Sequence, residues 1–218
     1  MASPLIVAWP VDKKVKMFLR RVHRCILLGI VLCLLRSVAA AAAAREGTEL
    51  IGTKALSWGV TNWINSQPLS LDALRGSVVL VRWWTGPECP YCALSAPYLK
   101  TWDEKYHTHG LIVVGLYHHK SAEPLSRQHV EQLVKRYGFM FPVAIDPDWG
   151  TLKRWWLEGR SRPWTSVSFL IDQQGIIRSV HPGGSYTEAE AEAMEFTIQE
   201  LLKTPQPVTS ATGGTFGR

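Results

Sequence analysis

The stretch Ser77–Leu99, SVVLVRWWTGPECPYCALSAPYL, contains the pattern that decides the fold. Its first eight residues are β-branched, apolar or aromatic apart from one serine and one arginine, and they lie between Gly76 and the turn-forming Thr85-Gly86-Pro87. A short apolar run bounded by turn residues is typical of a strand that is buried on both faces. After the CPYC sequence, apolar residues recur at a helical spacing, at Leu94, Tyr98, Leu99 and Trp102. The stretch therefore predicts a buried strand followed directly by a helix.

Two cysteines, Cys89 and Cys92, begin this helix and are separated by Pro90 and Tyr91. The unpaired N–H groups and the positive end of a helix favour a thiolate at the first cysteine, and the thiolate is the nucleophile in disulfide exchange. Cys92 lies one helical turn further along, where its sulfur is able to form a disulfide with Cys89. Proline fits the first turn, because its missing N–H has no partner there. We expect Cys89 to attack a partner disulfide and Cys92 to resolve the mixed disulfide. A zinc site is disfavoured, because it needs about four ligands and the chain has no second CxxC.

Strands and helices alternate along the rest of the chain. The expected strands are 77–84, 111–117, 142–145, 167–171 and 176–180, and the expected helices are 91–106, 123–137, 149–157 and 188–202. The segment 45–66 is expected to hold a leading strand or hairpin. This order indicates an α/β fold with a mostly parallel central sheet, helices on both faces and an antiparallel C-terminal hairpin. We expect one domain over residues 45–202 and a disordered tail over 203–218, which is rich in Thr, Gly, Pro and Ser.

Residues 1–44 have the layout of an export signal. This segment holds seven Lys and Arg residues and one Asp, so it carries the whole net charge of +6. A basic stretch over 13–24 is followed by an apolar stretch over 25–35, which is short for a membrane span of about 20 residues, and by a run of alanines. We expect a cleaved signal peptide, with the mature chain beginning between Ala40 and Glu46. The alternative is an uncleaved N-terminal anchor.

These features set the expected location and partners. The protein is predicted to be exported to a periplasmic or other extracytoplasmic location, and to contact a membrane only through the first 44 residues if they are not removed. The charge of the remaining chain is balanced, so a basic groove for nucleic acid is not expected. We expect a monomer that exchanges disulfides with protein thiols and disulfides.

Two stretches resemble the thioredoxin superfamily: Ser77–Leu99 and the sequence FLIDQQGIIRSVHPGG over Phe169–Gly184. They are similar to the TlpA/ResA-like exported oxidoreductases and to redoxin (AhpC-TSA-type) domains, and the similarity covers roughly 47–202. The resemblance implies a thioredoxin-like fold with an attacking first cysteine and a resolving second cysteine. It implies no cofactor. The function it implies is that of an exported thiol–disulfide oxidoreductase.

Three positions depart from the family pattern. Glu88, in an approach to Cys89 that is longer by one residue, is expected to oppose thiolate formation. Ser166 stands where the family has a cis-proline. Because a cis bond before another residue type costs about 2.5–4 kcal/mol, we expect a trans bond, with the hydroxyls of Thr165 and Ser166 available to the Cys89 thiolate. Arg82 stands where the family often has a buried carboxylate or polar residue, and a cation there is expected to help hold a thiolate.

Two other functions stay open. His118 and His181 follow predicted strands, and with Cys89 and Cys92 they offer the ligands of a copper site in a thioredoxin-like chaperone, although solvated loop histidines are the favoured interpretation. A peroxiredoxin-like peroxidase needs a Thr or Ser shortly before its attacking cysteine. Pro87 stands in that region, which counts against this alternative.

Overall fold

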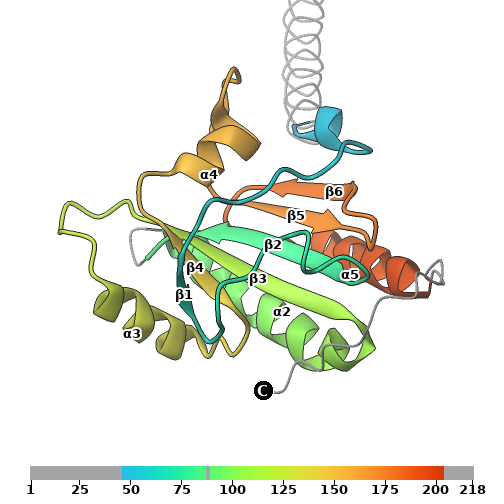
Figure 1. Cartoon of the computed structure of the whole chain (residues 1–218), viewed down its shortest axis with the longest axis horizontal. Coiled ribbons are helices and arrows are strands. Elements are labelled where there is room, and N and C mark those ends of the chain that lie inside the picture. Colours follow the sequence, from blue (N-terminus) through green and yellow to red (C-terminus); the bar gives the residue numbers. More distant parts are fainter. Residues whose placement is uncertain (1–45, 87–88, 204–218) are drawn as a thin grey trace, which may run out of the picture. The chain divides into compact units, whose positions relative to one another are not determined.

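A six-stranded sheet forms the centre of the structure, a computed structural model that describes residues 46–86 and 89–203 (Figure 1). In the order in which they pair, the strands are β1 (Asn62–Ile64), β4 (Val143–Asp146), β3 (Leu111–His118), β2 (Val78–Trp84), β5 (Val167–Ile171) and β6 (Ile177–Pro182). Strands β2, β3 and β4 are parallel, whereas β1, β5 and β6 each pair antiparallel with their neighbours. The predicted α/β class and C-terminal hairpin are confirmed. The sheet is mixed rather than mostly parallel, because antiparallel strands flank its parallel centre on both sides.

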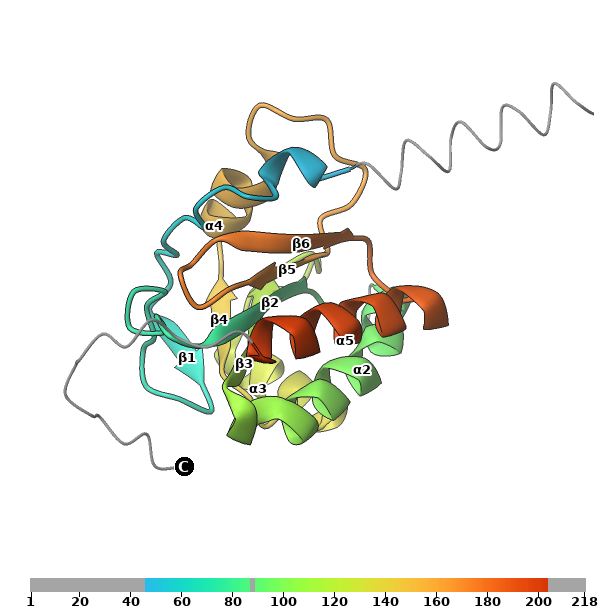
Figure 2. The same ribbon diagram turned by 90° about the vertical axis from the view of Figure 1, so that its right-hand side faces the viewer.

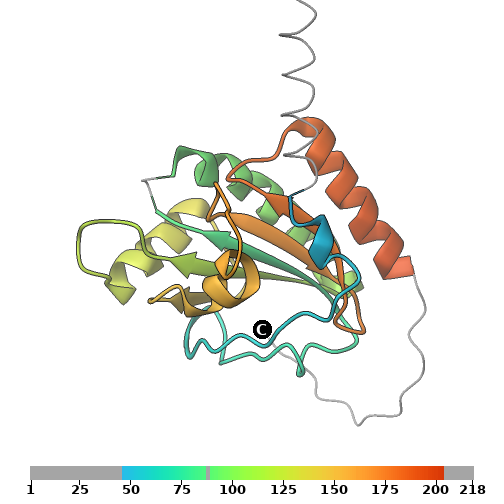
Figure 3. The same cartoon turned by 90° about the horizontal axis from the view of Figure 1, so that it is seen from above.

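Helices cover both faces of the sheet, as expected. The helices are α2 (Pro90–Tyr106), α3 (Arg127–Tyr137), α4 (Gly150–Leu152) and α5 (Glu188–Lys203), with single turns at η1 (Thr48–Leu50), η2 (His107–His109) and the π-helical η3 (Lys153–Leu157). Helices α2, α3 and α5 pack on one face, and α4, η3 and the segment 47–76 pack on the other (Figures 2 and 3). The helix expected over 123–137 begins at Arg127, because the hydroxyl of Ser126 caps it by accepting the His129 N–H.

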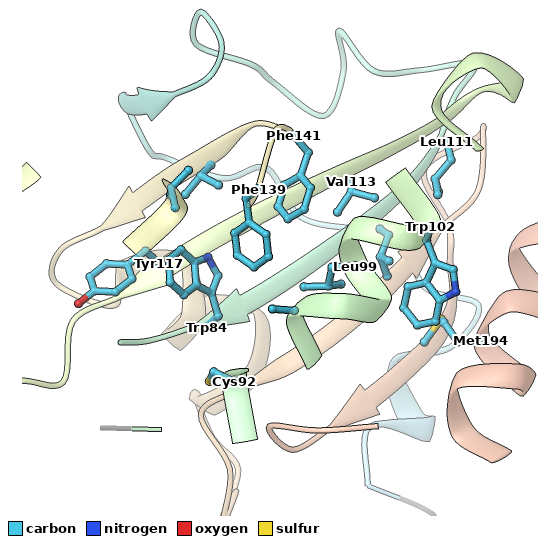
Figure 4. Close-up of a cluster of buried hydrophobic side chains, with 14 of the residues drawn as sticks. Trp84, Cys92, Leu99, Trp102, Leu111, Val113, Tyr117, Phe139, Phe141 and Met194 are labelled. Carbon is cyan, nitrogen blue, oxygen red and sulfur yellow. The ribbon is translucent and has the colours of Figure 1, made fainter. Parts of the chain in front are cut away.

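Strand β2 is buried along its whole length, as its apolar sequence predicts. Because side chains alternate along a strand, Val78, Leu80 and Trp84 join the hydrophobic cluster under α2, and Val79, Val81 and Trp83 join the cluster on the opposite face. Arg82 falls on the α2 face. Figure 4 shows the cluster under α2, in which Cys92 lies at the start of the helix, on the side of Trp84, and Leu99 lies further along the helix.

The N-terminal part of the domain contributes less sheet than expected. Over 45–66 it forms one three-residue strand, β1, at the edge beside β4, and Lys54 forms an isolated bridge to Ile176. The predicted signal segment, 1–44, lies outside the described residues. Lys203, the first residue of the predicted tail, is the last residue of α5, and the rest of that tail also lies outside. Within 46–86 and 89–203, no helix combines the length and the apolar character needed to cross a membrane.

Candidate active site

Cys89 is the N-cap residue of α2 and follows the last residue of β2 by five positions. Its backbone is extended, and its Sγ accepts the backbone N–H of Cys92 at 3.2 Å. Pro90 occupies the first helical turn, as expected. The pKa of Cys89 is lowered to about 6, first by a hydrogen bond from the Cys92 thiol and further by the Cys92 N–H, the Ser166 hydroxyl and the charge of Arg82, while burial opposes the shift. Cys89 is therefore a half-buried thiolate at neutral pH.

Cys92 has the opposite character. It is 3% exposed, and its pKa is raised by the hydrogen bond to Cys89 and by burial. Three groups act against this rise: the charge of Arg82, the hydroxyl of Ser166, whose Oγ lies 3.5 Å from Cys92 Sγ, and the backbone of Thr85. The two cysteines are free thiols. The structure thus combines one accessible, ionised sulfur with one protected, protonated sulfur.

Arg82 is fully buried next to this pair, and all its hydrogen-bond acceptors are neutral. Its Nη1 donates to Ser168 Oγ at 3.1 Å, and its Nη2 donates to the carbonyl of Gly184 at 2.8 Å and weakly to Ser95 Oγ at 3.5 Å. The ring of Tyr186 lies 5.7 Å from the guanidinium carbon. Arg82 Nε is buried without a hydrogen-bond partner.

The loop before β5 carries Thr165 and Ser166. The described residues contain no cis peptide bond, so the bond before Ser166 is trans, as expected. The Ser166 hydroxyl contacts Cys92 and lowers the pKa of both cysteines. The Thr165 hydroxyl lies 3.0 Å from His118 Nε2, so the structure pairs it with that histidine rather than with Cys89.

The two candidate metal-binding histidines have other partners. His118 is buried, lies edge-on to Trp149, and burial lowers its pKa to about 3, so its imidazole is neutral. His181 stacks on Tyr186 with ring centroids 4.2 Å apart and pairs with Glu190 at 3.5 Å. Across the described parts of the chain, no three side chains of metal-ligand type come together. The four residues of the copper alternative therefore do not form one metal-binding group.

Sequence reasoning missed part of the site. Gly184 packs so tightly against the CxxC turn that a Cβ on it would lie 2.4 Å from Tyr91 Cβ and 3.4 Å from Cys89 Sγ. Ser95 and Tyr186, which surround Arg82, were also missed. The paired glycines of HPGG were the available signal, because a residue without a side chain marks a close approach of the backbone. Glu88 lies outside the described residues.

Comparisons with known proteins agree with this geometry. A sequence model of the Redoxin family matches residues 63–195, more than half of the chain. The chain belongs to the Redoxin family. This Redoxin-family protein is 29% identical over 174 residues to Protein DipZ of Mycobacterium bovis, an alignment that covers 75% of this chain and 24% of DipZ. The chain thus spans about a quarter of the length of that relative.

Two further similarities concern shorter proteins. The Redoxin-family protein is 28% identical over 137 residues to the thiol-disulfide oxidoreductase ResA of Halalkalibacterium halodurans, covering 63% of this chain and 72% of ResA. Its structure matches a crystal structure from Chlorobium tepidum described as a thiol:disulfide interchange protein DsbE, with a TM-score of 0.57, 27% identity, and coverage of 70% of this chain and 97% of the other. The predicted thioredoxin-like fold and the TlpA/ResA-like resemblance are confirmed.

Proposed function

We propose that this Redoxin-family protein is an exported enzyme that exchanges disulfides with partner proteins through Cys89 and Cys92. The contrast between the two sulfurs carries the proposal. Cys89 is accessible, caps a helix and has a pKa of about 6, so it is ionised under ordinary conditions. Cys92 is buried and protonated within reach of it. A thiolate poised beside a protected thiol is the arrangement that a two-step exchange requires.

In the reducing direction, the Cys89 thiolate attacks one sulfur of a partner disulfide. The partner S–S bond breaks, a mixed disulfide forms, and the released partner sulfur takes a proton. Cys92 then loses its proton and attacks Cys89 Sγ, so that the second partner sulfur leaves and the Cys89–Cys92 disulfide forms. The partner gains two electrons and the enzyme loses two. The reverse sequence oxidises a partner dithiol.

A protein is the partner that the surroundings of Cys89 favour. Exposed apolar side chains lie on the first turns of α2, where Tyr91 is 49% and Leu94 is 59% exposed, and Trp164 is 46% exposed beside Thr165. Such side chains supply the apolar contact area of protein–protein interfaces. The names of ResA and DsbE, both thiol–disulfide proteins, support the same class of substrate.

Trapping the mixed disulfide tests the function. With Cys92→Ser, the first step proceeds and the second is blocked, so the variant should accumulate covalent complexes with an unfolded, disulfide-containing substrate protein. Cys89→Ser is the matched control, since it removes the attacking sulfur and keeps the fold. Covalent complexes that form equally well with Cys89→Ser would overturn the assignment of the two roles.

Export is supported by the basic, apolar and alanine-rich succession over 1–44. Sequencing the N-terminus of protein taken from its native host should give a first residue between Ala40 and Glu46. A chain that keeps its first 35 residues in a membrane fraction would show an anchor instead.

A further inference from the structure

We propose that Arg82 is a positioning residue that makes the Cys89–Cys92 pair an oxidant of protein dithiols, by stabilising the thiolate released when the disulfide opens. This inference rests on the proposed function and gives it a direction.

Arg82 is a buried cation, and burying a cation costs free energy. Arg82 is 0% exposed, and no carboxylate contacts it within the described residues: its guanidinium donates only to two hydroxyls and one carbonyl. A buried charge without a counter-charge is strongly unfavourable. The neighbouring groups that become negative during the reaction are the two sulfurs. Arg82 donates to Gly184, on which a Cβ would lie 3.4 Å from Cys89 Sγ, and to Ser95, whose hydroxyl donates to the Cys92 carbonyl. In keeping with this geometry, the charge of Arg82 lowers the pKa of both cysteines. The reduced enzyme therefore supplies the counter-charge that the disulfide form lacks.

Cys92 is the leaving group when the Cys89–Cys92 disulfide opens. When a partner thiolate attacks Cys89, the sulfur that departs is Cys92, inside the domain. In the mixed disulfide, Cys89 carries no charge, so its hydrogen bond no longer raises the pKa of Cys92. The remaining influences are burial, which disfavours the thiolate, and Arg82, the Ser166 hydroxyl and the Thr85 backbone, which favour it. Of these three, only Arg82 carries a full charge.

The reaction balances without another reagent. A partner thiolate attacks Cys89 Sγ, the Cys89–Cys92 bond breaks, and Cys92 leaves as a thiolate beside Arg82. The second partner thiolate attacks the partner sulfur of the mixed disulfide, and Cys89 leaves as a thiolate at the helix N-terminus. The partner dithiol loses two electrons and two protons and gains a disulfide; one proton returns Cys92 to its thiol form and the other goes to solvent. The enzyme gains the two electrons, and a second protein disulfide of higher reduction potential must take them to restore the enzyme.

Redox equilibrium with a glutathione buffer tests the role of Arg82. Compared with the unaltered protein, Arg82→Gln should favour the disulfide form at least about tenfold, which corresponds to a reduction potential about 30 mV more negative. Arg82→Lys keeps the charge and should recover part of this shift. Arg136 is exposed on α3 and lies far along the chain from the two cysteines. Arg136→Gln therefore removes the same charge as a control and should leave the reduction potential of the Cys89–Cys92 pair unchanged.

A second measurement needs no variant. If the fold stabilises the thiolate form, the reduced protein should melt at a higher temperature than the oxidised protein. If Arg82→Gln does not fold, the comparison of the two melting temperatures still tests the proposal. The inference is wrong if the oxidised protein melts higher, or if a folded Arg82→Gln keeps the original potential. Failure of the proposed function looks different: the unaltered protein would then not exchange disulfides at all.

Discussion

Gly184 lies directly against Tyr91, so closely that a Cβ on the glycine would come within 2.4 Å of the tyrosine Cβ. Real Cβ atoms do not approach this closely, so Gly184→Ala must move either the loop after β6 or the CxxC turn. The Gly184 carbonyl also accepts a hydrogen bond from Arg82, so the displacement should disturb the contact with Tyr91 and the hydrogen bond to Arg82 together. We expect disulfide exchange by Gly184→Ala to slow by about ten- to a hundredfold.

The matched control is Gly150→Ala. The nearest atom to a Cβ at Gly150 is at 3.7 Å, on the flexible side chain of Arg154, which is ordinary contact. This variant should keep the exchange rate of the unaltered protein. Equal rates for the two variants would mean that the contact between Gly184 and Tyr91 does not position the site.

The rate of alkylation of Cys89 should depend on pH with a midpoint near 6. Above that pH the sulfur is a thiolate and reacts with iodoacetamide, whereas Cys92 is buried and should react far more slowly. Mass spectrometry of peptides after a short exposure to the reagent measures both sites. Faster labelling of Cys92, or a midpoint near 9, would contradict the described geometry.

The same ionisation links stability to pH in the reduced protein. The pKa of Cys89 is about 6 in the fold and 9.0 without it, so folding favours the thiolate. The resulting stabilisation is fully present above pH 9 and is lost as the pH falls to about 6. The melting temperature of the reduced protein should therefore decrease as the pH is lowered from 9 to about 6. Cys89→Ser should remove this contribution of Cys89 to the pH dependence of the melting temperature.

Removal of the Ser166 hydroxyl should slow the release of Cys92. A hydrogen bond to a charged group contributes about 1.5–3 kcal/mol, so Ser166→Ala should lower the rate at which the Cys89–Cys92 disulfide opens by roughly tenfold or more. Ser166→Pro removes the same hydroxyl and should lower the rate as well. Thr165→Val is the control, because that hydroxyl pairs with His118. Stopped-flow measurement of reduction by dithiothreitol compares them, and a slower Thr165→Val would refute the distinction.

Asp172 holds the turn between β5 and β6. Its carboxylate accepts the N–H groups of Gln174 and Ile176 and the Nε of Arg178, all within 2.9 Å, and it is 3% exposed. Asp172→Ala leaves these donors without their acceptor and should reduce the free energy of unfolding by about 2–3 kcal/mol. Chemical denaturation measures this loss, and the exposed Asp148→Ala should be nearly neutral.

The elements that were predictable from sequence are those with strong local patterns. Strand β2 and helix α2 follow from the apolar run, the turn residues and the helical spacing after Cys89. The edge strand β1 was poorly defined, because its three residues are held by pairing with β4, about 80 residues away in the chain. The local sequence of a strand does not predict which distant strand it pairs with.

The residues of the candidate active site likewise include some that local sequence predicts and some that it does not. The places of Cys89 and Pro90 follow from local helix chemistry. The surroundings of Arg82 do not, because its acceptors Ser168 and Gly184 lie 86 and 102 residues further along the chain. Pairing of β5 with β2 places Ser168 opposite Arg82, and the loop after β6 brings the Gly184 carbonyl to it.

The alternation along β2 separates two kinds of residue. Val79, Val81 and Trp83 face a cluster rich in aromatic rings, to which neither cysteine belongs, while Leu80, Arg82 and Trp84 face the side that holds Cys92. One layer of backbone therefore stands between the aromatic packing around Trp83 and the pair of sulfurs.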